Sequence, residues 1–517
     1  MIVVYDRENG QVVSSFVANS RISDMADDIL QRMHPDQNRN LSYCEVDYNG
    51  RIPFGCKVEL VDGMAFRLHC NDKVYFEMDP EELRKMVLAE RQKERDKMLN
   101  SLPFRNDDNL KRLFGEYLPM MRQTSELTRH RIADNSYFKG DILPIGWWGS
   151  FVDAGGYANM NREITQRLPN YGIIPKTDIY PTPSQIDKGT ESVLRTMSGL
   201  RVKTDRYPFV YAFTPMAHQR HYGKRIFYTM METSSLHPEF VSHCNEYSDE
   251  VWVPSVANRE LFTSNGVRKK IRVMPLGIDE KLYFDTEVST DFPLEDCVGL
   301  YGMDPRNGIA KRRFLTVIQW NFRKGFDALI KAFCRAFSSM DDVCLVIATQ
   351  YSKEVVKADL DQYVPSMSGL PQVLLYNKIV PISRMPSLYD SCDCYIHLSR
   401  GEGFSLTQIE AAARGLPVIS CMHSGMTEYL REDNSYPVSC PEREMCHPNL
   451  ANISFYYQGQ TLWKLGDRQV DQAAEYMRHV VSHPEEAAMK ASVMKEDVIS
   501  KYTWDRSAER IAEALRA

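Results

Sequence analysis

Residues 394–419, CYIHLSRGEGFSLTQIEAAARGLPVI, hold the most specific pattern in the chain. An apolar strand candidate over 394–398 leads into a small glycine-containing loop and the start of a helix. Glu402 and Glu410, separated by seven residues, stand on either side of this junction. Free backbone N–H groups at a helix start attract phosphate. A carboxylate before the loop can reach a sugar, and one inside the helix can accept both hydroxyls of a ribose. The layout therefore suits a ligand that combines phosphate, sugar and ribose.

The stretch resembles the donor site of the retaining glycosyltransferases of family 4 and their relatives, whose signature is E-G-F-G-x-x-x-x-E-A-x-A-x-G-x-P-V-I. Ser405 replaces the second glycine, and the remaining positions match closely. Four other segments resemble the same family in the same order: 251–267, 271–279, 320–333 and Ser424-Gly425-x-x-Glu428. The resemblance covers roughly residues 140–515 and nothing before about 135.

The resemblance implies an α/β protein of GT-B architecture, in which two Rossmann-like domains face a cleft and the C-terminal one holds the donor. The alternation of strand and helix candidates from about residue 140 agrees with it, and ligands bind at the carboxyl ends of such strands. We therefore predict four parts. They are an N-terminal α+β appendage with a connecting helix (1–135), an acceptor domain (136–285), a donor domain after a polar linker (305–470), and C-terminal helices that recross to the first Rossmann-like domain (471–517).

The first 100 residues are predicted to form short strands, turns and helices. Asn9-Gly10 and Asp62-Gly63, each between apolar runs, predict two hairpins, and residues 23–33 predict a helix between them. Residues 80–100 are highly charged and rich in helix formers, which predicts a solvated connecting helix rather than a nucleic-acid binder. The pattern assigns no function to this appendage.

Bulk composition indicates a soluble chain of several domains. With 517 residues the chain exceeds what one core usually holds, and its net charge of -6 argues against a protein that is basic all over. No apolar run approaches the ~20 residues of a membrane span. Asp6 and Arg7 stand where a signal peptide would be apolar. We expect a cytoplasmic protein, in the host cytoplasm if the source is viral.

The 12 cysteines fit reduced thiols in a large intracellular chain. Cys392-x-Cys394 lies in a strand-like run and is interpreted as a buried thiol pair rather than a metal site. Cys440 and Cys446-His447 have no second half for a zinc site, so we expect structural or surface roles for them.

The resemblance implies a phosphate clamp just after the strand candidate Phe314–Ile318. Lys324 and Arg323 would neutralise the donor diphosphate, which must leave with its two charges. Lys324 is the stronger candidate, since Arg323 also fits a solvated surface position. Gln319 or Trp320 stands where many family members carry an arginine, so the clamp has fewer charges than usual.

The loop and helix of the motif complete the donor site that the resemblance implies. Glu402 would contact the transferred sugar, and Glu410 would bind the ribose hydroxyls. Backbone N–H groups would face the sugar and diphosphate from Gly403, Phe404, Ser405 and Leu406.

The first Rossmann-like domain would supply the facing wall. Gly155-Gly156 follow its first strand, where glycine lets backbone approach a phosphate closely; a simple turn is the alternative. Glu232 ends another strand candidate and could contact the acceptor or the sugar. We group it with Glu402 and Lys324 as the candidate catalytic residues.

The predicted reaction is retaining transfer from a UDP- or GDP-linked sugar. No protein nucleophile is evident on suitable spacing, which fits a same-face route in which the leaving phosphate helps to deprotonate the acceptor. No DxD-like pair stands at a strand end in the donor half, so we expect no metal and no other cofactor. A GT-B phosphorylase would need a pyridoxal phosphate lysine, for which no convincing candidate stands in the sequence.

The acceptor is the least specified part. Seven Lys or Arg and one acid, Asp205, lie from Arg195 to Arg225, interleaved with aromatic residues. This surface is either a scattered solvated face or a site for an anionic acceptor: DNA with hydroxymethylated bases, a phospholipid or an anionic glycan. A DNA enzyme would flip its base. A catalytically silent binding or assembly module is the alternative from another class, and the sequence leaves the oligomeric state open. The candidate acceptor-binding residues are His218, Arg220, His221, Lys224 and Arg225.

Overall fold

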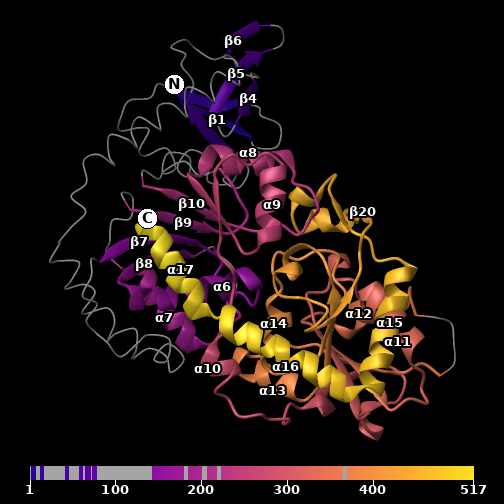
Figure 1. Ribbon diagram of the computed structural model, residues 1–517. Coiled ribbons are helices and arrows are strands. Elements are labelled where there is room, and N and C mark those ends of the chain that lie inside the picture. The colour runs from indigo at the N-terminus through magenta and orange to yellow at the C-terminus, as the bar shows by residue number, and fades with distance from the viewer. Residues whose placement is uncertain are drawn as a thin grey trace. The chain divides into compact units, whose positions relative to one another are not determined.

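A computed structural model of the protein describes six strands within residues 2–77, and then residues 142–179, 184–200, 207–217, 223–364 and 369–517 (Figure 1). The chain divides into two compact units, residues 1–101 and 102–517. Among the described helices, none is long and apolar enough to cross a membrane.

The first unit contains two antiparallel sheets, with strand orders β2-β1-β3 and β4-β5-β6. Their strands are β1 (Ile2–Asp6), β2 (Val12–Phe16), β3 (Leu41–Glu45), β4 (Lys57–Val61), β5 (Met64–Cys70) and β6 (Lys73–Glu77). The hairpins predicted from Asn9-Gly10 and Asp62-Gly63 are confirmed as the pairs β1–β2 and β4–β5. The helices predicted over 23–33 and 80–100 lie outside the described residues.

The second unit begins with a six-stranded parallel sheet of order β12-β11-β10-β9-β7-β8. Its strands are β7 (Leu143–Gly149), β8 (Ile173–Ile179), β9 (Phe209–Ala212), β10 (Arg225–Tyr228), β11 (Glu250–Val253) and β12 (Lys270–Val273). The connecting helices are α6 (Gly156–Arg167), α7 (Lys188–Ser198), α8 (Pro238–Tyr247), α9 (Val256–Ser264) and α10 (Glu280–Tyr283). Every residue of β9 and β11 is buried, as expected for strands covered on both faces.

A second sheet has seven strands in the order β13-β16-β15-β14-β17-β18-β19. They are β13 (Val298–Tyr301), β14 (Arg312–Val317), β15 (Val343–Ala348), β16 (Gln372–Tyr376), β17 (Cys394–His397), β18 (Val418–Cys421) and β19 (Tyr436–Val438). Its helices are α11 (Phe326–Ala336), α12 (Lys353–Leu360), α13 (Met385–Asp390) and α14 (Leu406–Ala413). All strands are parallel except β13, which pairs antiparallel with β16. This edge strand lies inside the stretch 285–310, which the sequence predicts to be a loop-like linker. The strand was not predicted, because a four-residue run is too short to stand out in a polar segment. The predicted α/β class, with two Rossmann-like sheets, is confirmed.

The chain ends in α15 (Asp467–Ser482), α16 (Pro484–Lys501) and α17 (Trp504–Arg516). Figure 1 shows α17, in yellow, beside α6 of the first Rossmann-like sheet. The buried Arg167 guanidinium of α6 anchors this contact. It pairs with Glu163 at 2.6 Å, Asp279 at 3.0 Å and Asp505 at 3.1 Å. Of these three carboxylates Asp505 belongs to α17, so the Arg167–Asp505 pair links the last helix to α6.

Candidate active site

The carboxyl ends of β14 and β17 meet because these strands are parallel neighbours in the second sheet. Arg323 and Lys324 follow β14 in a short 3-10 turn, and Glu402 follows β17. Gly325 makes the close approach possible: its φ is +66°, and a Cβ there would lie 1.7 Å from the Leu398 carbonyl oxygen. The sheet order thus brings Glu402 next to Lys324, 78 residues earlier in the chain, and next to its neighbour Arg323.

Glu402 is the centre of a buried charge cluster. Its Oε1 lies 2.6 Å from Lys324 Nζ, 3.3 Å from Arg323 Nη1 and 3.0 Å from His397 Nε2, and only 5% of the residue is exposed. Burial alone would raise the pKa of this carboxyl, but Lys324, Arg323 and the hydrogen bond from His397 hold the pKa well below its ordinary value. Burial lowers the pKa of His397, which then donates to Glu402 as a neutral imidazole. Glu402 is therefore a carboxylate that holds two cations in place.

The loop that carries Glu402 is fixed to the rest of the domain by Arg400. The guanidinium of this residue forms a two-pronged ion pair with Asp327 of α11, at 2.7 and 2.8 Å, and stacks on the Phe322 ring. Arg400 is 2% exposed. A paired, planar contact of this kind defines orientation as well as distance. The contacts of Arg400 therefore fix the loop, and with it the position of Glu402.

Glu232, which follows β10 in the first sheet, reaches the same cluster. Its Oε1 lies 3.6 Å from Arg323 Nη2, and the Tyr457 hydroxyl donates to its Oε2 at 2.8 Å. Gly401 packs directly on its backbone, since a Cβ there would lie 1.9 Å from the Glu232 carbonyl oxygen. The three candidate catalytic residues, Glu232, Lys324 and Glu402, therefore surround one guanidinium, that of Arg323.

Tyr457 belongs to a segment that extends from the second sheet to the first. This segment contains the short hairpin of β20 (Arg443–Met445) and β21 (Thr461–Trp463). Ser234 N donates to the Thr461 carbonyl oxygen at 2.8 Å, and the Tyr456 hydroxyl donates to the Pro215 carbonyl oxygen at 2.7 Å. No motif in the sequence predicts this link between the two sheets, because its contacts join residues more than 200 positions apart.

The donor loop enters α14 through a backbone conformation that disfavours side chains. Ser405 has φ +72°, in the left-handed region where the family signature has glycine, and its Oγ accepts from Gln408 at 3.1 Å. The Phe404 side chain is buried, so this residue can offer a ligand only its backbone. The Gly403 carbonyl oxygen accepts from Ser255 Oγ of the first sheet at 3.1 Å. No side chain caps the start of α14 at Leu406, which leaves that end suited to an anion.

Glu410 lies inside α14, 8% exposed. The Tyr389 hydroxyl donates to its Oε2 at 2.8 Å. Burial raises the pKa of Glu410 from 4.5 to about 7, although the hydrogen bond from Tyr389 opposes that shift. Near neutral pH this carboxyl is therefore divided between its protonated and ionised forms.

Three polar side chains near the strand ends have buried atoms with no hydrogen-bond partner among the described residues. They are both amide atoms of Asn321, Thr349 Oγ1 and His397 Nδ1. Asn321 and Thr349 stand just beyond the carboxyl ends of the neighbouring strands β14 and β15. Because buried polar groups are nearly always paired, these atoms are candidates for ligand contacts. None of the three is a candidate from the sequence, although Asn321 and Thr349 follow apolar strand candidates and His397 lies within one.

Gly155-Gly156 form the start of α6, which no side chain caps, and both residues are exposed. The next residue, Tyr157, accepts a hydrogen bond from Met230 N at 3.0 Å. Met230 in turn packs on Gly403, where a Cβ would lie 2.7 Å from its Cγ. Two residues, Tyr157 and Met230, thus lie between the glycine pair and the donor loop.

The candidate acceptor residues are placed only in part. His218, Arg220 and His221 lie outside the described residues. Lys224 pairs with Glu250 at 3.1 Å, and Arg225 pairs with Asp249 at 3.1 Å. Both pairs stand at the amino ends of β10 and β11, the opposite edge from Glu232. The structure does not bring Lys224 and Arg225 to the cluster around Arg323.

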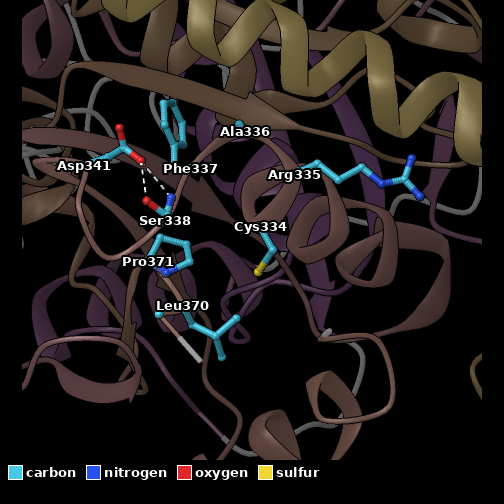
Figure 2. A pocket seen from close by; sticks show the side chains of 9 residues that line it. Cys334, Arg335, Ala336, Phe337, Ser338, Asp341, Leu370 and Pro371 are labelled. Atoms are coloured by element: carbon cyan, nitrogen blue, oxygen red, sulfur yellow. Dashed lines mark hydrogen bonds between the residues drawn. The ribbon is translucent and has the colours of Figure 1, made fainter. Parts of the chain in front are cut away.

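A pocket of about 290 Å³ lies at another edge of the second sheet (Figure 2). The end of α11, the residues that follow it and those just before β16 line this pocket, and there the Asp341 carboxylate accepts from the Ser338 backbone N–H at 2.8 Å. This pocket is at the amino ends of the strands, away from Glu402. The candidate active site is therefore the cluster at the carboxyl ends.

Comparison with known proteins finds relatives of part of this chain. Residues 311–445 match the family described as Glycosyl transferases group 1. Mannosylfructose-phosphate synthase of Agrobacterium fabrum is 26% identical over 164 residues, 31% of this chain and 34% of that protein. Alpha-monoglucosyldiacylglycerol synthase of Streptococcus pneumoniae is 26% identical over 172 residues, 33% of this chain and 37% of that protein. The chain thus matches about a third of the length of these curated relatives.

Among solved structures, Anabaena HepE in complex with UDP-glucose has a TM-score of 0.51 to this chain and 15% identity, and the match covers 72% of this chain and 99% of that one. This likeness concerns the fold, and with the two parallel sheets it confirms the predicted GT-B architecture. Residues 311–445, which match the group 1 glycosyl transferase family, include Lys324, Glu402 and Glu410.

Proposed function

We propose that the protein is a retaining glycosyltransferase of the family 4 type, which moves a sugar from a nucleotide-sugar donor to an acceptor hydroxyl without a metal ion. The observation that carries the proposal is the cluster in which Lys324 and Arg323 share the Glu402 carboxylate near the uncapped start of α14. Two fixed cations and a helix start together suit a diphosphate.

In this proposal Glu402 orients the two cations before the donor binds. Burial lowers the pKa of Lys324, and the Glu402 carboxylate at 2.6 Å opposes that shift and holds the ammonium in position. Binding of the donor diphosphate gives Lys324 and Arg323 a second anionic partner. Glu402 can then also accept a hydrogen bond from a hydroxyl of the transferred sugar.

The nucleoside part of the donor is assigned to Glu410, Asn321 and Thr349. Glu410 as a carboxylate accepts both ribose hydroxyls, and the unpaired atoms of Asn321 and Thr349 offer further contacts beyond β14 and β15. The complex of HepE with UDP-glucose supports a UDP-linked donor as the first to test, and a GDP-linked donor as the second.

The reaction follows a same-face route. The bond between the anomeric carbon and the diphosphate oxygen breaks, the acceptor oxygen bonds to that carbon on the same face, and the departing phosphate oxygen takes the acceptor proton. Arg323 and Lys324 stabilise the charge that develops on the diphosphate. Glu232, which Tyr457 and Arg323 orient, contacts the acceptor or the sugar.

For the acceptor we propose an anionic molecule, with hydroxymethylated DNA, an anionic glycan and a phospholipid as the three classes to compare. The relatives named above make a phosphorylated sugar and a glycolipid. The basic residues that motivate a DNA acceptor lie mostly outside the described residues. An acceptor screen by mass is therefore the test of this part.

Replacement of the cluster tests the proposed chemistry. Lys324→Ala and Glu402→Ala should each lower donor turnover by about 10²-fold or more, the usual effect of removing one charge-stabilising group. Lys378→Ala, an exposed lysine of the same domain, is the matched control and should keep full turnover. Circular dichroism spectra would verify folding. Full activity in both cluster variants would overturn the site assignment.

A further inference from the structure

Three metal-ligating side chains converge at the ends of β18 and β19. Cys421 is the last residue of β18, His423 follows it by two residues, and Cys440 stands two residues beyond β19. The two strands are parallel neighbours, with Cys421 opposite Val438. The ligand atoms of the three residues all lie within 4.8 Å of one another.

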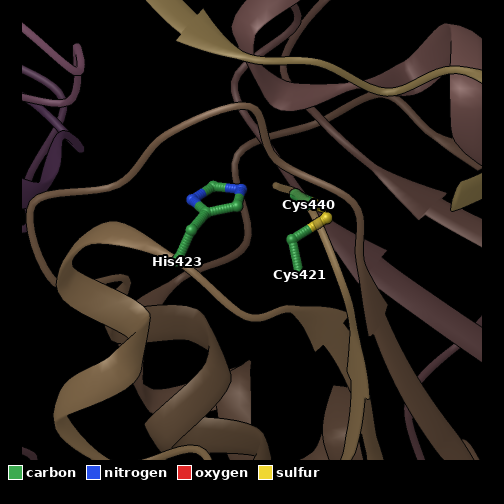
Figure 3. Close-up of side chains that lie close together, drawn as sticks. All are labelled: Cys421, His423 and Cys440. Carbon is green, nitrogen blue, oxygen red and sulfur yellow. The ribbon is translucent and has the colours of Figure 1, made fainter. Parts of the chain in front are cut away.

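The cluster corrects the interpretation of Cys440 as a cysteine without partners for a metal site. Its partners precede it by 19 and 17 residues, on the other side of a loop that returns the chain to the sheet. Figure 3 shows an edge of the His423 ring directed toward the two cysteine side chains. All three residues are buried, and both cysteines are free thiols. The spacing Cys-x-His at 421–423 was the available sequence signal.

The three ligand atoms determine which kind of ion can bind. Two sulfur atoms and one imidazole suit Zn²⁺ or another thiophilic ion, and they do not suit Mg²⁺ or Ca²⁺, which prefer oxygen ligands. Zn²⁺ in structural sites is four-coordinate and tetrahedral, so three protein ligands leave one coordination position for an oxygen atom. The Ser399 carbonyl oxygen, 3.0 Å from His423 Nε2, lies beside the cluster.

The surroundings of His423 match those of a ligating histidine. Its Nδ1 lies 3.1 Å from Ser424 Oγ, and its Nε2 lies 3.0 Å from the Ser399 carbonyl oxygen. Whichever nitrogen binds an ion, the other keeps an oxygen partner, which is the usual second contact of such histidines. The ring also stacks on Trp463, with centroids 4.5 Å apart and planes within 6°. His423 is thus held in one orientation.

We propose that Cys421, His423 and Cys440 bind a single zinc ion as a structural site of the second Rossmann-like domain. The site has a direct link to the donor loop, since Ser424 Oγ also accepts from Glu402 N at 3.1 Å. Binding of the ion would hold His423, and through it Ser424 and the backbone of Glu402. The site is separate from the cations assigned to the diphosphate, and the proposal does not rest on the proposed function.

Metal analysis and cobalt titration of the full chain test this proposal. Protein purified without a metal-affinity tag should contain close to one zinc ion per chain, as measured by inductively coupled plasma mass spectrometry. Wild-type chain stripped of metal should take up Co²⁺ with a thiolate-to-cobalt charge-transfer band in the near ultraviolet. Zinc should raise the thermal unfolding midpoint of the stripped wild type.

Two variants and a control locate the ion. Cys421→Ser and Cys440→Ser should each lose the retained zinc and the cobalt band. Cys334→Ser, a half-buried cysteine of α11 outside the cluster, should keep both. Because the cobalt titration uses the wild-type chain, its result does not depend on the folding of a variant. The absence of retained zinc together with no cobalt band in the wild type would overturn the proposal, as would a disulfide between Cys421 and Cys440 in the purified protein.

Discussion

Glu410→Gln should make the stability of the protein less dependent on pH. Glu410 lies 8% exposed in α14, and burial raises the pKa of its carboxyl from 4.5 to about 7. Glutamine has a similar shape and keeps an oxygen that can accept from the Tyr389 hydroxyl, but its amide group does not titrate in this pH range. The variant therefore removes one titration and changes the packing little.

The magnitude follows from the two pKa values. Their difference, about 2.5 units between 4.5 and about 7, corresponds to roughly 3 kcal/mol at 1.36 kcal/mol per unit. Since the pKa is raised in the folded state, the folded chain retains a proton that the unfolded chain has already lost. The free energy of unfolding therefore falls as pH rises from about 4.5 to about 7, and this contribution is constant outside that window.

Urea denaturation at several pH values between 5 and 8 would measure this effect. Wild type should lose up to roughly 3 kcal/mol of unfolding free energy relative to Glu410→Gln across the window, while other titrating groups cancel in the comparison. Glu475→Gln, on the exposed face of α15, is the matched control and should follow the wild type. Parallel profiles for wild type and Glu410→Gln would refute the placement of Glu410 in a desolvated site.

Three further outcomes are expected from the same geometry. Tyr457→Phe removes the hydroxyl that donates to Glu232 at 2.8 Å, so the acceptor KM should rise while the donor Kd is unchanged. Equal changes in the acceptor KM and the donor Kd would place Glu232 on the donor side. Ser405→Gly relieves φ +72° and should leave thermal stability equal or higher, whereas Ser405→Val should lower stability by ~1–3 kcal/mol; a stable valine variant would contradict the left-handed conformation. Initial transfer rates with Mg²⁺ and with EDTA added at the start of the assay should agree, because two protein cations stabilise the diphosphate, and an immediate loss with EDTA would exclude that mechanism.

The parts of the fold that follow from local patterns could be predicted from the sequence. The run 394–419 predicts a strand, a loop and a helix, and β17 and α14 occupy these places. β15 and β16 are short, largely apolar runs of the kind that predicts a buried strand. The strand β8 was not predicted, since Pro175 and Lys176 interrupt its apolar pattern.

Contacts between distant residues could not be predicted in the same way. Glu232 and Tyr457 are 225 residues apart, and no motif connects them. Cys421, His423 and Cys440 converge only because β18 and β19 are neighbours, an arrangement that depends on the order of the whole sheet. Unpaired side-chain atoms such as those of Asn321 become visible only when every possible partner has been placed.

A donor screen tests the central claim, transfer from a nucleotide sugar, most directly. Purified full-length protein would be incubated with UDP-, GDP- and ADP-sugars, with and without hydroxymethylcytosine DNA, while nucleotide release and acceptor mass are followed. We expect nucleotide release with one of the donors, and loss of that release in Lys324→Ala. A mass gain of one sugar on the DNA would identify the acceptor, and its absence would direct the search to glycans and lipids. No release and no donor binding would contradict the account and favour a catalytically silent GT-B binding module.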